Sequence, residues 1–197
     1  IIYKDQHIIA INKPSGLLVH KSPIDKHETR YAMKILRGQI GQWVYPVHRL
    51  DKPTSGLLLF ALSPEIAKNL GEQFASNRIK KTYVAIVRGH TPLGGIIRHP
   101  LKETAMFKNE KGRFEAKAPK EAVTHFRKIA QVEIPYNVDK YPVSRYSLVQ
   151  LSPVTGRQHQ LRRHMKHIAH PIIGDPKYGK SVHNHFFETE FGVHRLL

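Results

Sequence analysis

The chain has 197 residues, of which 32 are Lys or Arg and 15 are Asp or Glu, so its formal net charge is +17. It contains no cysteine, which excludes a disulfide scaffold, a thiol nucleophile, an iron–sulfur cluster and a cysteine zinc site. No apolar run approaches a membrane span, and the first residues lack a signal-peptide pattern. We expect a cytoplasmic protein that attracts polyanions, nucleic acid above all, although solvated surface cations alone could account for the charge.

Hydrophobic periodicity and turn residues predict strands and helices that do not alternate regularly, which favours an α+β fold in one domain, residues 1–197. Ser63 and Pro64 are residue types of an N-cap and a first helical position. In chain order we expect strands at 8–11 and 17–19, a helix at 27–37, extended chain at 44–48, a strand at 57–62, a helix from 63, a strand at 80–87, a mobile loop at 102–120, strands at 123–134 and 145–151, and a helix at 157–168.

The segment HRLDKPTSG at residues 48–56 carries the first candidate for chemistry. Its one acid, Asp51, stands between Arg49 and Lys52, and nearby positive charge favours the ionised carboxylate. A predicted strand precedes the segment and a turn follows Asp51, so the side chain can be presented to a ligand. Alternatively, Asp51 is a loop residue that caps the amides of Thr54 and Ser55.

A second candidate is the segment TGRQHQLRRH at residues 155–164. On a helix, Arg162 shares a side with Gln158 and Lys166, next to the apolar side of Leu161 and Met165. An arginine beside a buried stripe can pair with an inward-facing acid. The alternative is a surface helix whose cations lie along its apolar edge.

Two further patterns are open to two interpretations. Tyr83 follows Lys80 and Lys81 on a predicted strand, where it could be a stacking platform for a base or a packing residue. His164, His167 and His170 are spaced three apart, which suggests a metal site. No acid lies between them, however, and Pro171 ends the helix, so contacts to phosphate or to a helix end are favoured.

Taken together and in this order, the motifs resemble the RluA family of pseudouridine synthases. The matching segments are 12–17 with 19–20, 48–56, 81–85 with Gly89, 155–162, and 170–175 with 178–179. The resemblance implies a catalytic domain with a central mixed, largely antiparallel sheet flanked by helices. The family has glycine where this chain has Ala169, which predicts slightly different packing there. It also continues past residue 197 into further strands, and many of its members carry an accessory RNA-binding domain in front, so we expect this chain to lack both.

The resemblance also assigns roles. Asp51 would attack the target nucleotide, so that uracil detaches, rotates and rejoins the ribose through carbon. Arg162 would pair with Asp51, Tyr83 would stack on the uracil, and Arg49 would take the place of the flipped uridine in the RNA stack. His48, Thr54 and Leu161 would support the active site, and Lys13, Lys81, Arg157, His159 and Arg163 would bind RNA.

Within the family the chain is most similar to the TruC group, whose members act on uridine 65 of tRNA. The features are residues 19–22, 141–146, 162–164 and 183–184 before 191–192. The resemblance implies an RNA substrate, tRNA or alternatively ribosomal RNA, and no cofactor, no metal, no membrane and no obligate protein partner, so we expect a monomer. The other hypotheses are a catalytically silent RNA-binding protein of this fold and a histidine-metal nuclease. We also expect the mobile loop at 102–120 to contact RNA.

Overall fold

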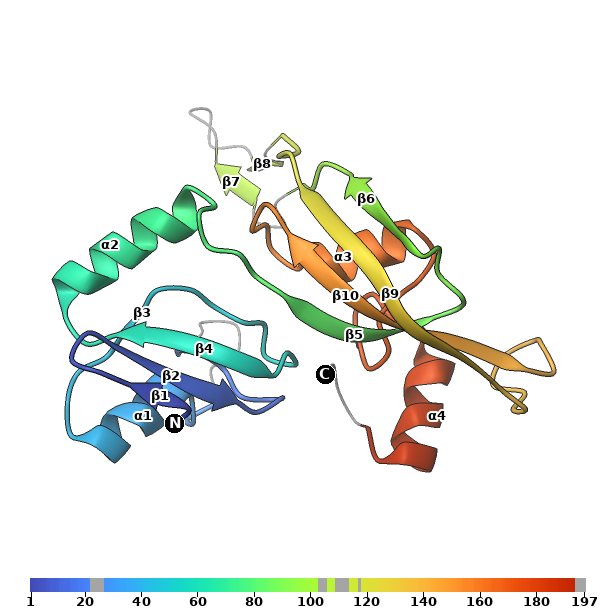
Figure 1. Ribbon diagram of the computed structural model, residues 1–197, viewed down its shortest axis with the longest axis horizontal. Helices are drawn as coiled ribbons and strands as arrows, with labels where there is room; N and C mark the ends of the chain where they lie inside the picture. Colours follow the sequence, from blue (N-terminus) through green and yellow to red (C-terminus); the bar gives the residue numbers. More distant parts are fainter. Residues whose placement is uncertain (22–26, 103–105, 109–113, 117, 194–197) are drawn as a thin grey trace. The chain divides into compact units, whose positions relative to one another are not determined.

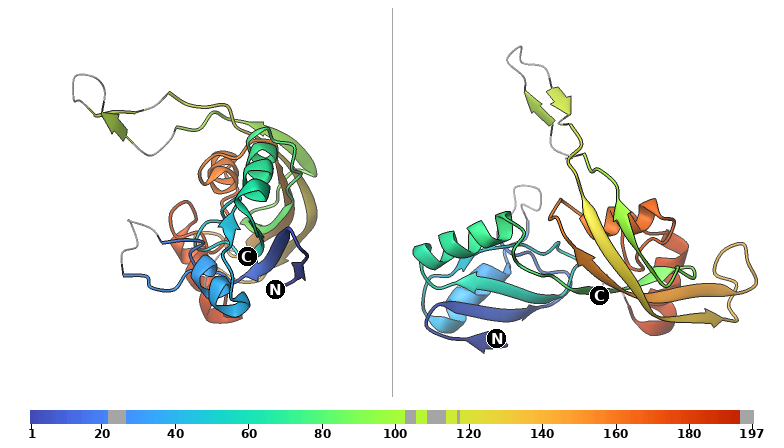
Figure 2. Two further views of the ribbon diagram at one scale, coloured as in Figure 1. Left: turned by 90° about the vertical axis from the view of Figure 1, so that its left-hand side faces the viewer. Right: turned by 45° about the horizontal axis from the view of Figure 1, so that its top comes forward.

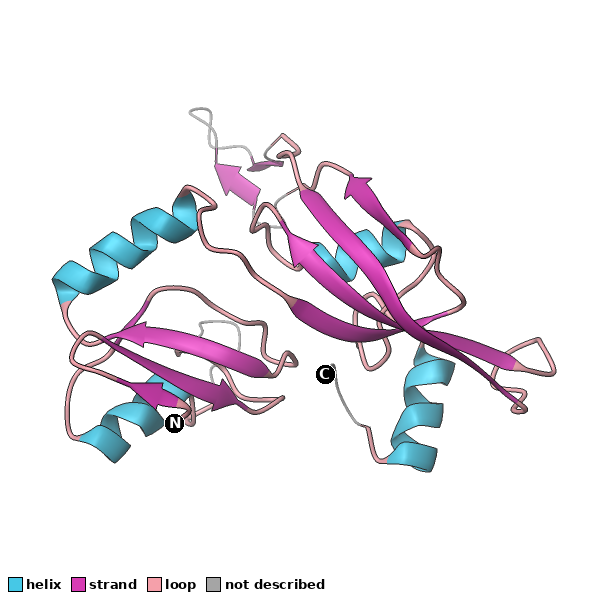
Figure 3. Ribbon diagram, viewed as in Figure 1, coloured by secondary structure: helices cyan, strands magenta, loops and turns pink. Residues whose placement is uncertain are grey.

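The computed structural model describes residues 1–21, 27–102, 106–108, 114–116 and 118–193, and it divides into two compact units (Figure 1). The described residues between 1 and 79 belong to the first unit, and those between 80 and 193 belong to the second. Among the described residues each unit holds one four-stranded antiparallel sheet and two helices (Figure 3). The α+β class is confirmed, although the strands form two such sheets and not one central mixed sheet.

The sheet of the first unit has the order β1 (Tyr3–Lys4), β2 (Ile8–Lys13), β4 (Gly56–Ala61), β3 (Tyr45–Pro46). Ile9, Leu58 and Phe60 are fully buried and form part of the core of this unit. Lys13, the last residue of β2, pairs with Gly56, the first residue of β4. The turn that follows β2 therefore lies beside the loop that precedes β4.

Two helices belong to the first unit, α1 (Ala32–Ile40) and α2 (Pro64–Ala75). The prediction for the start of α2 is confirmed, because Ser63 is the N-cap and its Oγ accepts a hydrogen bond of 3.3 Å from the Ile66 amide. The prediction for α1 is shifted, because the helix runs through Gly38 and ends at Gly41, whose φ of 67° is left-handed.

The sheet of the second unit has the order β5 (Tyr83–Arg88), β10 (Ser144–Pro153), β9 (Val123–Ile134), β6 (Gly94–Arg98). The bounds of β9 are those predicted from its sequence. The β9–β10 pairing shifts register between Leu148 and Val149, which marks a β-bulge. A two-stranded ribbon, β7 (Met106–Lys108) with β8 (Phe114–Ala116), extends from this unit (Figure 2). Of the loop predicted at 102–120, residues 103–105, 109–113 and 117 lie outside the described residues, and Lys120 forms a bridge with Leu101.

The helices of the second unit are α3 (Gln160–His167) and α4 (Ser181–Phe191). Gln160 joins α3 to the sheet, because its Nε2 donates to the Val123 carbonyl at 3.0 Å. Tyr146 joins α4 to β10, because its hydroxyl lies 2.8 Å from Nδ1 of His183 and its ring packs edge-on against Phe187. β1, β6 and α4 were not predicted from the sequence. The strand predicted at 17–19 contains only an isolated bridge from Leu18 to Tyr31 among the described residues.

Candidate active site

The Asp51 loop connects β3 to β4 and is fixed at several points to its own unit. At its start, His48 Nε2 accepts a hydrogen bond of 3.0 Å from the Leu59 amide of β4, and the His48 ring stacks on Phe74 of α2 at 4.8 Å. Within the loop, the Thr54 amide donates to the Asp51 carbonyl at 3.0 Å. Asp51 itself is half-buried. The loop is therefore tied to strand and helix while it presents Asp51 at its bend.

The turn after β2 supports this loop from the adjacent side. The Gly16 amide donates to the Lys52 carbonyl at 2.8 Å, and the Ser15 hydroxyl donates to the Pro53 carbonyl at 2.6 Å. The Lys52 side chain pairs with Glu28 at 2.7 Å. These contacts hold the two residues that follow Asp51 in place.

Lys13 is the buried link between the turn and the loop. Its side chain is fully buried, and its ammonium group donates to the carbonyls of Pro14 at 2.9 Å, Leu17 at 2.8 Å and Lys52 at 3.2 Å. Burial lowers the pKa of Lys13 to about 8, and the charge of Asp51 acts in the opposite direction. Because the ammonium group is bonded to carbonyls inside the fold, the structure argues against the RNA contact expected for Lys13.

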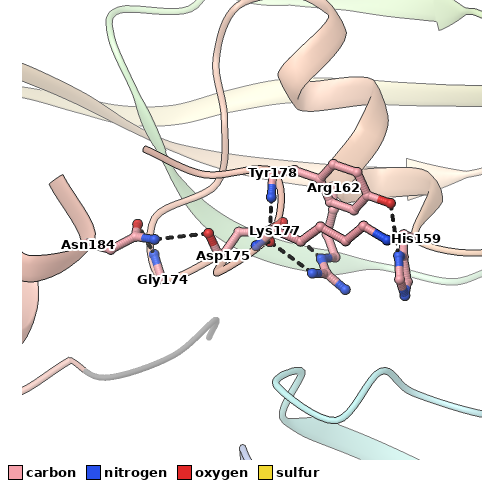
Figure 4. A network of polar contacts seen from close by, with 7 residues as sticks. All are labelled: His159, Arg162, Gly174, Asp175, Lys177, Tyr178 and Asn184. Atoms are coloured by element: carbon pink, nitrogen blue, oxygen red, sulfur yellow. Dashed lines mark hydrogen bonds and ion pairs between the residues drawn. The ribbon is translucent and has the colours of Figure 1, made fainter. Parts of the chain in front are cut away.

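In the second unit, Arg162 of α3 forms a buried ion pair with Asp175 (Figure 4). Nε and Nη2 of Arg162 each donate to one carboxylate oxygen of Asp175 at 2.8 Å, and the two side chains are 8% and 0% exposed. Burial would raise the pKa of Asp175, but hydrogen bonds from Arg162 and from the Tyr178 and Lys177 amides outweigh it and hold the pKa below its usual value. Arg162 lies beside the apolar stripe of α3, as predicted from the sequence, but Asp175 was not predicted as its partner.

The family model described as RNA pseudouridylate synthase matches residues 7–167, which span most of both units. This chain belongs to that family. The synthase is 54% identical to the tRNA pseudouridine synthase C of Pasteurella multocida (strain Pm70) over 197 residues, which are 100% of this chain and 81% of the relative. It is 49% identical to the protein of the same name from Vibrio parahaemolyticus, over 100% of this chain and 80% of the relative. The RluA-family resemblance is thus confirmed, and the synthase is an isomerase.

Solved structures agree with the family. The structure described as human RNA pseudouridylate synthase domain containing 1 is 26% identical to the synthase, with a TM-score of 0.72 over 99% of this chain and 73% of that chain. A second human structure, RNA pseudouridylate synthase domain containing 4, is 29% identical, with a TM-score of 0.64 over 90% of this chain and 68% of that chain. The predicted fold is therefore that of known synthases.

The other predicted active-site residues of the synthase are distributed over both units. Arg49 is exposed and Thr54 is half-buried in the Asp51 loop, whereas Leu161 is half-buried in α3. Tyr83 is the first residue of β5, is half-buried, and pairs with Leu151 of β10. Because Asp51 belongs to the first unit and Arg162 and Tyr83 to the second, their predicted meeting in one site stays a prediction.

Three of the predicted RNA-binding residues of the second unit lie on or near the start of α3, and the fourth, Lys81, precedes β5. Arg157 is exposed and its Nε donates to the Glu121 carbonyl at 3.0 Å, whereas Arg163 donates to the Lys102 carbonyl at 2.8 Å. His159, the N-cap residue, has a left-handed φ of 53°, and its Nδ1 lies 3.1 Å from the Tyr178 hydroxyl. Lys81 is half-buried, and burial lowers its pKa. The RNA-binding role of these residues was expected from the family resemblance, and it stays a prediction.

The three spaced histidines contact other groups of the second unit, and His99 is a partner of both His164 and His167. Nδ1 of His164 lies 2.9 Å from the Thr124 hydroxyl, the His167 ring stacks on His99 at 3.8 Å, and Nδ1 of His170 lies 2.8 Å from the Arg88 carbonyl. Over the described residues, no group of three or more His, Cys, Asp or Glu side chains is placed to hold a metal ion. The same part of the chain contains no helix that is long and apolar enough to cross a membrane.

Proposed function

We propose that the synthase converts uridine 65 of tRNA to pseudouridine in the cytoplasm, with Asp51 as its catalytic residue. The observation that carries the tRNA assignment is the 54% identity, over the whole of this chain, to a tRNA pseudouridine synthase C. The net charge of +17 suits a polyanionic substrate. The role of Asp51 is supported by the contacts that fix its loop to β4, α2 and the turn after β2.

The proposed reaction is an isomerisation that balances without an oxidant or a cofactor. The bond from C1′ of the ribose to N1 of uracil breaks, and a bond from C1′ to C5 forms. The hydrogen on C5 leaves as a proton, and N1 takes up a proton. Asp51 supplies the carboxylate that attacks the nucleotide, and the base is first turned out of its stack.

We infer that residues of both units serve this step. Arg162 holds Asp51 ionised, Tyr83 stacks on the uracil, and Arg49 replaces the flipped nucleotide. His48, Thr54 and Leu161 shape the site, and for His48 the support is its bond to the β4 backbone. For Lys13 we propose a positioning role on the Asp51 loop in place of RNA binding. Both units then form one catalytic domain that acts as a monomer, which is supported by the family match across both.

For RNA binding we propose Lys81, Arg157, His159 and Arg163, together with residues 102–120. Support comes from the exposed position of Arg157 and from the grouping of His159, Arg157 and Arg163 at the start of α3. If Arg157 and Arg163 each contact one phosphate, replacing either by Gln lowers the dependence of log affinity on log salt by about 1. Unchanged slopes for both variants would refute the phosphate contacts.

The experiment that tests the target is pseudouridine mapping on unmodified tRNA and ribosomal RNA after incubation with the protein. We expect pseudouridine at tRNA position 65 alone. A modified site in ribosomal RNA instead would overturn the tRNA assignment and leave the chemistry in place. No product on either RNA, with binding retained, would overturn the catalytic proposal and favour a silent RNA-binding protein.

A further inference from the structure

The Arg162–Asp175 pair is the centre of a network that links α3 to α4 (Figure 4). Besides the two bonds from Arg162, one oxygen of the Asp175 carboxylate accepts the amides of Lys177 at 2.9 Å and Tyr178 at 3.0 Å. A single buried carboxylate therefore fixes both a side chain of α3 and the backbone turn that follows Asp175. The Tyr178 ring adds a further contact, because Cζ of Arg162 lies over the ring, 5.2 Å from its centroid.

The turn itself is anchored to α4 by one side chain. Asn184 Oδ1 accepts the Gly174 amide at 2.8 Å, and Asn184 Nδ2 donates to the Asp175 carbonyl at 2.9 Å. The same carbonyl accepts the Gly179 amide at 3.1 Å, and the backbone is so close there that a Cβ on Gly179 would stand 2.4 Å from it. Asn184 and the lack of a side chain at Gly179 thus determine where the Asp175 carboxylate points.

Stability alone does not explain the buried Arg162–Asp175 pair. A buried ion pair gains little over well-packed apolar residues, because removing both charges from water is costly. Its particular use is orientation: a guanidinium bonded through Nε and Nη2 to one carboxylate is fixed in its plane, so its remaining N–H groups point in fixed directions. Catalytic groups need such fixed geometry.

We propose that Asp175 is a positioning residue for the synthase reaction, which orients the guanidinium of Arg162, and that Asn184 of α4 sets the position of Asp175. The proposal rests on the proposed role of Arg162 beside Asp51. Asp175 does not touch the substrate and acts through Arg162. The helix α4, which follows the family match at 7–167, thereby becomes part of the catalytic apparatus.

The test compares Asp175→Asn, Arg162→Lys and the double variant in single-turnover formation of pseudouridine on unmodified tRNA. Asn is isosteric with Asp, so its oxygen keeps the turn amides while the ion pair with Arg162 is lost. We expect Asp175→Asn to slow the single-turnover rate at least tenfold and to change the Kd for tRNA less than twofold. The double variant should be within twofold of the slower single variant, because both changes remove the same orientation. Asn184→Ala should slow the rate to a smaller extent.

The matched control is Asp139→Asn, which removes ion pairs to Lys180 and Arg88 in the same unit without touching Arg162. We expect its rate to stay within twofold of the wild type. If Asp175→Asn melts below the assay temperature, the comparison of Asn184→Ala with the control decides, and a normal rate for Asn184→Ala overturns the proposal.

The outcomes separate this proposal from the proposed function. A slow Arg162→Lys with a normal Asp175→Asn, or slowing factors that multiply in the double variant, overturns the positioning role and leaves the function in place. A normal Arg162→Lys overturns the role of Arg162, and with it this proposal. No product from the wild type on any RNA overturns the proposed function itself.

Discussion

Replacing Lys13 by Met tests whether the buried ammonium group holds the Asp51 loop. The substitution removes three hydrogen bonds to the carbonyls of Pro14, Leu17 and Lys52. Bonds from a charged donor contribute about 1.5–3 kcal/mol each, so the loss is roughly 4–9 kcal/mol. Burial of the charge, which moves the pKa from 10.5 to about 8, costs about 3 kcal/mol, and the variant recovers this amount. The net loss in the free energy of unfolding is therefore roughly 1–6 kcal/mol.

Thermal and urea unfolding measure this loss. At about 2–4 °C per kcal/mol for a chain of this size, the Tm of Lys13→Met should fall by at least ~2 °C. The matched control is Lys68→Met on the exposed side of α2, which should stay within about 0.5 kcal/mol of the wild type. We also expect a lower kcat for Lys13→Met at a temperature where it is folded, because the Lys52 carbonyl, next to Asp51, keeps only the Gly16 amide of its two donors. Equal stability and equal kcat for the two variants would refute the role of Lys13.

Three further predictions concern the second unit and its backbone. Gly179→Ala should destabilise the protein by about 1–3 kcal/mol and lower kcat, because a Cβ would collide with the Asp175 carbonyl. The control Gly71→Ala on α2 has open space around the new Cβ and should stabilise the protein by about 0.5–1 kcal/mol. Equal Tm values for the two variants would contradict this. Ala169→Gly should raise stability by about 0.5–1 kcal/mol in urea unfolding, since Ala169 has a left-handed φ of 62°, and a loss would count against that strain. Burial lowers the pKa of His164, so the unfolded chain binds its proton first and stability should fall as the pH drops below about 6.5; Tm against pH should be flatter in His164→Gln.

Periodicity predicted the strands and helices whose sequence is locally unambiguous. The alternation of 123–134 gave the bounds of β9, and the Ser63-Pro64 pair gave the start of α2. The predicted end of α1 at Gly38 was wrong, because Gly38 faces open space and the helix continues through it. The helix is capped at Gly41, whose backbone is left-handed. The strand β6, of sequence GGIIR, has too few side chains to show a period, and α4 has apolar residues on several sides.

The site was predictable as motifs but not as contacts. The segment around Asp51 and the arginine at 162 stand out in the sequence through charge and spacing. The sequence could not show that Lys13 is buried, because its partners are backbone carbonyls, which every residue type carries. The pairing of Arg162 with Asp175 joins residues 13 apart, and only the folded turn brings them together. The glycines at 174 and 179 that flank this turn were the available signal.

The most direct test of the central claim compares the wild type with Asp51→Asn in pseudouridine formation on unmodified tRNA. The variant keeps the size of the side chain and removes the carboxylate, so tRNA binding and Tm should be nearly unchanged. If Asp51 is the catalytic residue, the wild type forms pseudouridine at position 65 and the variant forms none above background. Product formation by Asp51→Asn at a rate close to that of the wild type would contradict the account.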